Sequence, residues 1–397
     1  MLKPKPLHAP ARLDESVLAA VRRATGAEKA ALHEPEFAGR EWDYVKECID
    51  TGWVSSVGTM VDRFEAMLAE ITGAERAVAT VNGTAALHIA VILAGAGQGD
   101  EVILPSFTFI ATANAVSYAG AVPHLADIDA NTIGLDAAKL DAHLRDVARV
   151  GPDGCVNRIT GRPIKAAIVM HAFGHPADLE GLAEVCARHK LVLIEDAAES
   201  LGSYYRGKHT GALTRIGALS FNGNKVVTTG GGGAVLTRDP ALGARAKHLT
   251  TTARLSAGWN FVHDEVGYNY RLPNINAALG CAQLERLADF IARKRALAER
   301  YRAAFAAVDS VSFVAEPPDS KSNYWLCNVM LDGARAAEQG AVLKALNDAG
   351  FGARPAWTPM HMLAMYRDCP RADLSVTEDM FRRLVSLPSS PALAGQG

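Results

Sequence analysis

Along most of this chain, segments with helical spacing of apolar residues alternate with short, continuous apolar runs. Between residues 61 and 73 apolar residues recur every three or four positions, which predicts a helix that ends at Gly73. Short continuous apolar runs predict strands, which in chain order cover residues 76–80, 101–105, 121–128, 165–173 and 191–197. Helical segments separate these runs, one of them beginning at Thr84 and another covering 178–190. Strands separated by helices predict a mainly parallel sheet covered on both faces.

The pattern changes after about residue 275. Residues 274–308 predict one long or broken helix, followed by strand candidates near 324–331 and a helix over 336–350. We therefore predict an α/β fold class with a large, mainly parallel-sheet domain and a smaller α+β C-terminal domain. The predicted parts are an N-terminal segment that closes over the cleft (1–59), the large domain (60–290) and the small domain (291–397).

Composition excludes several classes of protein. The 397 residues include 41 Lys and Arg against 43 Asp and Glu, a balance that argues against binding nucleic acid or an anionic membrane by bulk charge. None of the six cysteines lies within four residues of another, so no zinc or redox motif is present. The pair His263-Asp264 lacks further ligands nearby, which favours a solvated loop over a metal site. The longest apolar stretch, 85–97, is too short for a bilayer and the N-terminus lacks a signal peptide's apolar core, so we expect a cytoplasmic protein.

Candidate chemistry begins in the segment 81–91, which passes from a strand through Asn82-Gly83-Thr84 into a helix. Free backbone N–H groups and the positive end of the helix dipole make such a turn a seat for an anion. Gly83 allows close approach of the backbone, and Thr84 adds a hydroxyl donor. The alternative is an ordinary helix start with Asn82 as its cap.

Two further segments carry charged groups near predicted strand ends. Glu195-Asp196 ends the strand of 191–197, where a partnered carboxylate can hold a positive charge on a ligand or simply cap the next turn. Lys225 lies in a short polar loop before Gly230–Gly233, and a lysine shielded from water can form a Schiff base, although most lysines are solvated surface charges. The four glycines lack the spacing of a phosphate loop and predict a tight turn beside the site.

Taken together, these segments match the needs of pyridoxal phosphate. Its phosphate requires donors, its pyridinium nitrogen requires an anion and its aldehyde requires an amine. A nicotinamide cofactor is disfavoured, because the glycines of residues 94–105 follow a helix and precede a strand, the reverse of the order in a dinucleotide loop.

The chain resembles the sugar-nucleotide aminotransferases of the DegT type, which share the aspartate-aminotransferase fold (fold type I of the pyridoxal-phosphate enzymes). The resemblance covers roughly residues 31–391 and rests on the segments NGTAAL, PSFTFIATANAV, HAFGHPADLE, IEDAAESLGSYYRGKHTG, SFNGNKVVTTGGGGAVL and GYNYRLPNINAALG. Residues 32–56, the FNGNK sequence and the glycine run are most similar to enzymes of the bacillosamine and legionaminic-acid pathways. Those enzymes aminate a UDP-linked 4-keto-6-deoxy-N-acetylhexosamine.

The resemblance implies a role for each matching position. Lys225 would bind the cofactor covalently and be the catalytic residue, and Asp196 would pair with the pyridinium nitrogen. Further cofactor contacts are implied, with the phosphate held by Gly83, Thr84 and Ser220, the ring covered by Phe109 and Ala198, and the phenolic oxygen approached by Glu199. Asn269 would reach the phosphate of a neighbouring subunit, which implies a homodimer with shared active sites.

The implied substrates are a nucleotide sugar and L-glutamate. Segments that flank the nucleotide-sugar cleft in relatives contain five candidate substrate-binding residues, namely Trp53, Ser55, Asn323, Tyr324 and His361. A packing or turn role is equally open for each of the five. The expected reaction is ping-pong transfer of the glutamate amine to C4 of the UDP-linked 4-keto sugar. Alternatives are a GDP-4-keto-6-deoxymannose or a dTDP-3- or 4-keto sugar as the acceptor.

Two other functions remain as alternatives. A dehydratase that removes a C3 hydroxyl has the same fold, but such relatives carry His at the position of Lys225. A non-catalytic regulatory protein that binds the cofactor is disfavoured by the intact set of Lys225, Asp196 and Thr84.

Overall fold

A mixed, mainly parallel sheet forms the centre of the computed structural model, which describes residues 12–257 and 259–395. The strands lie in the order β1-β11-β10-β7-β6-β2-β3, and β5 pairs with β6 and β4 beyond this path. Their bounds are β1 Arg76–Thr80, β2 Glu101–Pro105, β3 Val122–Ala126, β4 Ala148–Gly151, β5 Gly154–Asn157, β6 Pro163–Met170, β7 Val192–Asp196, β10 Ile216–Ser220 and β11 Gly233–Thr237. Each strand predicted from the apolar runs is therefore confirmed.

Strand direction divides the sheet into two parts. Neighbouring strands from β3 to β10 are parallel, as the alternation of strands and helices predicts. At one edge, β11 runs antiparallel to both β10 and β1, so that Arg76 lies opposite Thr237 and Thr80 opposite Gly233. This arrangement brings the turn after β1 beside the loop that joins β10 to β11.

Helices cover both faces of the sheet, because successive strand residues point to opposite sides. Val102 and Leu104 of β2 pack in one apolar cluster, and Ile103 packs in another on the opposite face. The covering helices are α3 Thr59–Thr72, α4 Gly83–Leu93, α5 Ile110–Tyr118, α6 Ala137–Val147, α7 Leu179–Arg188 and α8 Pro240–Thr250. The predicted helices near residues 61–73, 84 onward and 178–190 are confirmed.

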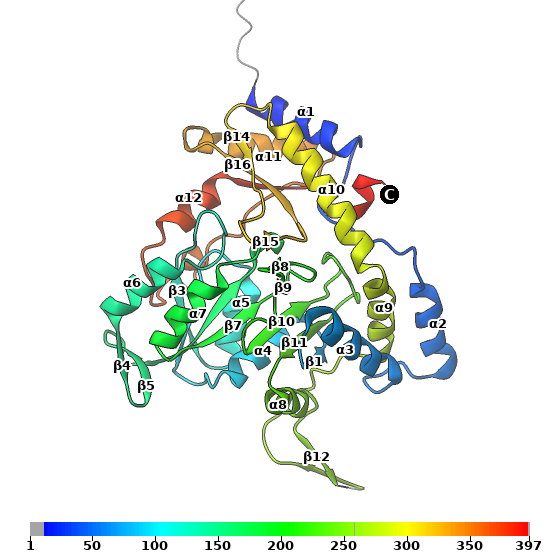
Figure 1. Ribbon diagram of the computed structural model, residues 1–397, viewed down its shortest axis with the longest axis vertical. Helices are drawn as coiled ribbons and strands as arrows, with labels where there is room; N and C mark the ends of the chain where they lie inside the picture. The colour runs from blue at the N-terminus through cyan, green and yellow to red at the C-terminus, as the bar shows by residue number, and fades with distance from the viewer. Residues whose placement is uncertain (1–11, 258, 396–397) are drawn as a thin grey trace, which may run out of the picture.

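A second core lies above the large sheet in Figure 1. It contains the antiparallel sheet β14-β16-β18-β17 and the helices α10 and α11. The element bounds here are α9 Asn274–Glu285, α10 Leu287–Phe305, β14 Val311–Phe313, β16 Cys327–Leu331, α11 Gln339–Asp348, β17 Arg354–Pro355, α12 Ser375–Arg383 and β18 Leu384–Leu387. The predicted helix over 274–308 is broken, since α9 ends and α10 begins around Arg286.

The N-terminal region contributes to both parts of the molecule. Helix α1 (Leu13–Thr25) buries Val17 and Val21 in the second core beside α10, whereas α2 (Glu41–Thr51) lies next to α9 (Figure 1). That residues 1–59 close over the cleft stays a prediction, and residues 1–11 lie outside the described part of the chain.

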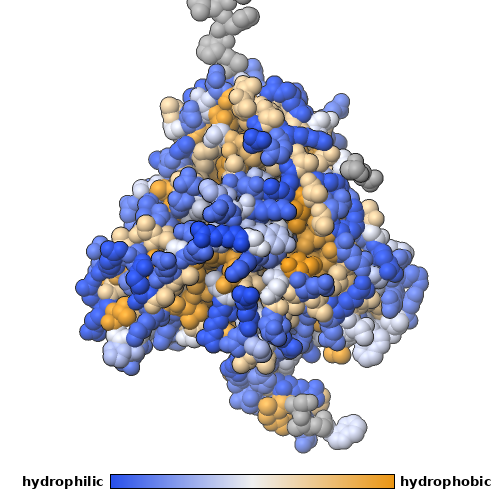
Figure 2. Space-filling model, in the orientation of Figure 1, coloured by the Kyte–Doolittle hydropathy of each residue, from blue (hydrophilic) through white to orange (hydrophobic). Residues whose placement is uncertain are grey.

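Short elements complete the fold. The two-stranded hairpin β12–β13 projects from the body below α8 (Figure 1), and part of its surface is apolar (Figure 2). The side chain of Phe261 on β13 is exposed. The remaining bounds are β8 Tyr204–Tyr205, β9 Lys208–His209, β12 Arg254–Ala257, β13 Asn260–His263, β15 Ser320–Lys321, η1 Ala172–Gly174, η2 Gly333–Glu338, η3 Met360–Met362 and η4 Pro391–Ala394. No helix within residues 12–257 and 259–395 combines the length and apolar content needed to cross a bilayer.

Candidate active site

A cavity of about 350 Å³ lies at the carboxyl ends of the parallel strands β6, β7 and β10. Such strand ends are where open α/β sheets bind ligands. The cavity gathers every predicted cofactor residue except Asn269, namely Gly83, Thr84, Phe109, Asp196, Ala198, Glu199, Ser220 and Lys225. Side chains from four separate stretches of the chain thus meet in one place.

The first wall is the N-terminus of α4. Asn82 caps the helix by accepting a 2.8 Å hydrogen bond from the backbone N–H of Ala85, while Gly83 and Thr84 begin the first turn and line the cavity. The cap and the anion seat are therefore two features of the same turn. A Cβ atom on Gly83 would lie 2.7 Å from Cβ of Ser220, so only glycine fits here. This crowded set of N–H and hydroxyl donors fits a phosphate group.

Asp196 forms the second wall, at the end of β7. It is 2% exposed and accepts hydrogen bonds from the Thr112 hydroxyl at 2.8 Å and the Ala198 N–H at 3.2 Å. Burial raises the pKa of Asp196, and the bond from Thr112 opposes that shift. A cationic ring nitrogen would supply the positive charge that this buried carboxylate requires.

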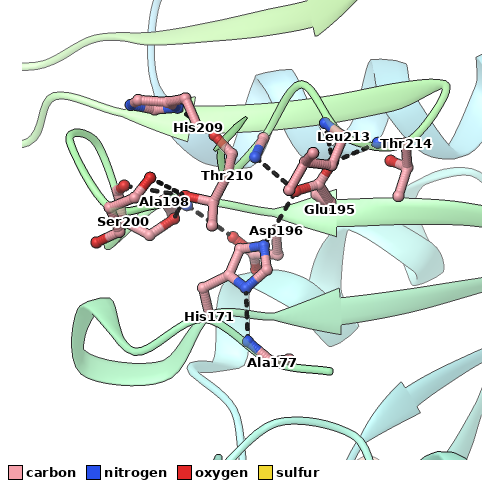
Figure 3. A network of polar contacts seen from close by, with 12 residues as sticks. His171, Ala177, Glu195, Asp196, Ala198, Ser200, His209, Thr210, Leu213 and Thr214 are labelled. Atoms are coloured by element: carbon pink, nitrogen blue, oxygen red, sulfur yellow. Dashed lines mark hydrogen bonds and ion pairs between the residues drawn. The ribbon is translucent and has the colours of Figure 1, made fainter. Parts of the chain in front are cut away.

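The adjacent Glu195 has a different task. Its carboxylate accepts hydrogen bonds from the backbone N–H groups of Leu213 and Thr214 and lies 3.1 Å from Nε2 of His171 (Figure 3). Nδ1 of His171 accepts a hydrogen bond from the N–H of Ala177, so this imidazole links the segment after β6 to the end of β7 (Figure 3). Of the Glu195-Asp196 pair, only Asp196 lines the cavity.

Lys225 lies in the loop that follows β10. Its side chain is 14% exposed, and Nζ lies 3.3 Å from Oε1 of Glu199 and 3.9 Å from the ring centroid of Trp325. Burial raises the pKa of Glu199 to about 7, although the Lys225 charge and the N–H of Phe173 act in the opposite direction. The amine is therefore held between a carboxyl group and an indole face, largely shielded from water.

Several residues that line the cavity were not predicted as site residues, among them Trp325, Thr112 and Trp357. Trp325 follows the quoted Asn323 and Tyr324 directly, and Thr112 lies inside the quoted PSFTFIATANAV segment. Trp357 stacks on Phe173 with ring centroids 4.7 Å apart and an interplanar angle of 7°. Of these three, only Thr112 could have been predicted locally, because it lies one helical turn after the cavity residue Phe109. The two tryptophans belong to parts of the chain far from that segment.

Asn323 and Tyr324 are buried behind the cavity and do not line it. Asn323 is fully buried, and its Nδ2 donates 2.9 Å hydrogen bonds to the carbonyls of Glu199 and Leu201. Tyr324 accepts a hydrogen bond from the N–H of Glu316 through its phenolic oxygen. In this conformation, both side chains hold backbone segments of the protein in place.

The other predicted contacts are also apart from this cavity. The backbone carbonyls of Trp53 and Ser55 accept hydrogen bonds from Asn274, at 2.7 and 2.6 Å, and the Trp53 side chain is 58% exposed. The imidazole of His361 lies between Ser106 and Glu378. Asn269 accepts a 3.0 Å hydrogen bond from Arg271 near the base of the projecting hairpin.

A larger cavity, of about 520 Å³, lies along α7. Half of its lining residues are aliphatic, with Leu179, Leu191 and Leu213 among them. Its lysine and carboxylate, Lys208 and Glu180, are exposed, whereas Asp196 and Glu199 of the smaller cavity are buried. The chemistry of the lining therefore identifies the smaller cavity as the active-site candidate.

Comparison with known proteins decides the family. Residues 35–396 match the DegT/DnrJ/EryC1/StrS aminotransferase family. The chain belongs to this family. It is 38% identical to the GDP-perosamine synthase of Caulobacter vibrioides over 368 residues, which cover 92% of this chain and 94% of that protein.

Two further similarities agree with this assignment. The chain is 36% identical to the putative pyridoxal phosphate-dependent aminotransferase EpsN of Bacillus subtilis, over 91% of each protein. The crystal structure of the aminotransferase TlmJ from Streptoalloteichus hindustanus superposes with a TM-score of 0.81 at 30% identity, covering 91% of this chain and 93% of TlmJ. The protein is thus a pyridoxal-phosphate-dependent aminotransferase of fold type I, as its sequence predicts.

Proposed function

We propose that this enzyme transfers the amine of L-glutamate to C4 of a UDP-linked 4-keto-6-deoxy-N-acetylhexosamine in two half-reactions. The observation that carries the proposal is the position of the Lys225 amine, in one cavity with Asp196 and the N-terminus of α4. The larger cavity along α7 is also lined by a lysine, a carboxylate and a helix start, but its Lys208 and Glu180 are exposed. In the smaller cavity, Asp196 is buried and the Lys225 side chain is only 14% exposed.

Each wall of the cavity has a part in the proposed reaction. The N–H groups of Gly83 and Thr84 and the Ser220 hydroxyl, which line the cavity, would hold the phosphate of the cofactor, and Asp196 would keep its ring nitrogen protonated. When bound, pyridoxal phosphate supplies an electron sink that weakens the bond between the amine-bearing carbon and its hydrogen. Phe109 and Ala198 border the space for the ring.

Lys225 is the proposed base and acid. Its free Nζ would accept the proton from the amine-bearing carbon of the donor and give it to the cofactor in the first half-reaction. In the second half-reaction it would take a proton from the cofactor and give it to C4 of the sugar. Glu199 and Trp325 hold this nitrogen at 3.3 Å and 3.9 Å, which limits the directions in which it can move. The indole of Trp325 also excludes water from one side of the amine.

The proposal for the acceptor sugar rests on the similarity of this sequence to enzymes of known type. Residues 32–56, the sequence 221–225 and the glycines at 230–233 support a UDP-linked N-acetylated sugar. A second candidate is GDP-4-keto-6-deoxymannose, which is favoured by the identities of 36% and 38% to two GDP-perosamine synthases. Both candidates present a C4 ketone to the same amine.

We further propose a cytoplasmic homodimer with shared active sites. Asn269 would extend to the cofactor phosphate of the second subunit, in keeping with its place outside the cavity of its own chain. The exposed apolar side chains of Trp259 and Phe261 on the hairpin support a role for that hairpin in the contact.

Two measurements test the proposal. Replacing Lys225 with Ala should abolish both the visible absorbance of the bound cofactor and turnover. Lys190→Ala is the control, since Lys190 donates hydrogen bonds to the carbonyls of Gly151 and Pro152, which do not line the cavity. Product analysis by NMR, after supplying glutamate and a panel of UDP-, GDP- and dTDP-linked keto sugars, identifies the acceptor. A fully active Lys225→Ala protein would refute the assigned amine.

A further inference from the structure

Lys294 is a second buried lysine, outside the cavity. It lies on α10, is 1% exposed, and donates hydrogen bonds from Nζ to the backbone carbonyls of Trp325, at 3.1 Å, and Ser389. Within the described residues no carboxylate pairs with it, and burial lowers its pKa to about 7. Burying an amine costs free energy. We therefore expect Lys294 to make a contact in the core that an apolar side chain could not make.

The carbonyl that Lys294 holds belongs to the residue that covers the Lys225 amine. The backbone N–H of Trp325 donates to Oδ1 of Asn323 at 2.8 Å, and its indole Nε1 donates to the carbonyl of Asn224 at 2.6 Å. With Lys294 on the carbonyl oxygen, Trp325 is fixed at its N–H, its C=O and its ring. These three anchors come from three different segments of the chain.

The second carbonyl links Lys294 to the N-terminal segment. The N–H of Ser389 donates to the carbonyl of Leu32, and the hydroxyl of Ser390 accepts from the N–H of Glu34. His33, between them, is buried and has no hydrogen-bond partner for either ring nitrogen among the described residues. It therefore does not compete with Lys294 for the two carbonyls.

We propose that Lys294 is a positioning residue of the active site, which keeps the indole of Trp325 over the Lys225 amine by holding the Trp325 carbonyl. The inference rests on the proposed role of Lys225. Because the face of an indole stabilises a nearby cation and excludes water, a displaced indole exposes the amine and loosens its alignment.

Tyr301 offers a matched control on the same helix. It lies two turns after Lys294, is fully buried, and donates a 2.9 Å hydrogen bond to the carbonyl of Pro388. Like Lys294, it ties α10 to the segment before η4. Unlike Lys294, it makes no hydrogen bond to Trp325, so Tyr301→Phe reports the effect of loosening α10 alone.

The test measures the rate at which Lys225 is acylated in the full-length protein freed of cofactor, read by mass spectrometry of the peptide that contains it. Lys294→Met and Trp325→Leu should each raise this rate about three- to tenfold, and the double variant should add nothing to either. Tyr301→Phe should leave the rate unchanged. In the loaded enzyme, the first two variants should lower kcat by about tenfold or more with a smaller change in KM.

A rate in Lys294→Met equal to that of the wild type, or an equal rise in Tyr301→Phe, would overturn the proposal. Should Lys294→Met fail to fold, Lys294→Gln replaces it, because the shorter amide cannot reach both carbonyls. The acylation rate needs no substrate or cofactor. Failure of the proposed function, seen as an active Lys225→Ala enzyme, is therefore distinguishable from failure of this inference.

Discussion

Nζ of Lys225 lies 3.3 Å from Oε1 of Glu199, and both side chains are largely withdrawn from solvent. Glu199 also accepts a 2.8 Å hydrogen bond from the N–H of Phe173. Phe173 has a positive φ of 57°, a strained conformation for a bulky residue. This backbone conformation directs the N–H of Phe173 at the Glu199 carboxyl group. Glu199 is therefore held in a fixed position beside the Lys225 amine.

The raised pKa of Glu199 predicts a specific pH dependence of stability. With a pKa of about 7 in the folded protein, against an ordinary value of 4.5, the folded state binds more protons between these values than the unfolded state does. This group therefore stabilises the fold below about pH 4.5, and its contribution is lost as the pH rises through 7. Glu199→Gln removes the titration, so the variant should gain about 2 to 3 kcal/mol relative to wild type between pH 4.5 and 8.

The measurement is the apparent free energy of unfolding in urea for the two cofactor-free proteins, at several pH values. The difference between the two proteins is the informative quantity, since the other titrating groups are common to both. A difference that stays constant with pH would mean that Glu199 ionises in the folded protein as it does in the unfolded chain.

Thr112 should contribute to cofactor affinity through Asp196. Thr112→Val deletes the 2.8 Å hydrogen bond that stabilises the buried carboxylate, so we expect cofactor binding to weaken by about tenfold or more. Titration with pyridoxal phosphate, followed by absorbance, gives the dissociation constant. Thr72→Val is the matched control, because its buried hydroxyl bonds the carbonyl of Leu68 within α3. Equal affinities in the two variants would contradict the role of Thr112.

Gly83 should tolerate no side chain. Gly83→Ala would place Cβ 2.7 Å from Cβ of Ser220 and push the α4 N-terminus away from the β10 strand end. The expected result is a loss of cofactor affinity of about a hundredfold, in line with a displaced anion seat. At Gly97 an added Cβ meets nothing within 4 Å, so Gly97→Ala should bind the cofactor normally. Normal binding by Gly83→Ala would show that this turn does not hold the phosphate.

A variant of Asn323 can distinguish a structural role of this residue from a role in binding the sugar. Asn323→Asp turns two donated hydrogen bonds, to the carbonyls of Glu199 and Leu201, into repulsive contacts between oxygens. We expect the thermal midpoint to fall by about 5 °C or more, whereas Asn131→Asp, at an exposed loop position, should leave it unchanged. An unaltered midpoint together with a raised KM for the sugar nucleotide would instead support the substrate contact.

Much of this fold can be predicted from local sequence, because the apolar residues of most elements have a clear helical or strand-like spacing. The runs at 101–105 and 191–197 became β2 and β7, since buried parallel strands leave little room for polar residues. The direction of β11 had no such signal. Its antiparallel pairing depends on the contact between β1 and β11, which are separated by more than half of the large domain.

The candidate active site also combines features that the sequence predicts with features that it does not. Gly83, Asp196 and Lys225 meet in one cavity, as chemical complementarity to the cofactor predicts. Sequence does not tell which face of a segment a polar residue occupies, and Asn323 therefore lies behind the cavity while its neighbour but one, Trp325, lines it. The link from Lys294 to Trp325 joins α10 to the segment before β16, and no local pattern encodes such a contact.

The pairing of β1 with β11 also sets an order of events during synthesis. Arg76 and its neighbours leave the ribosome long before Thr237, their partner in the sheet, has been made. Until then the edge strand has no neighbour, and the seat at Gly83 has neither Ser220 nor Lys225 beside it. If these residues hold the cofactor as proposed, the nascent chain has no complete site for pyridoxal phosphate until about the first 240 residues have left the exit tunnel.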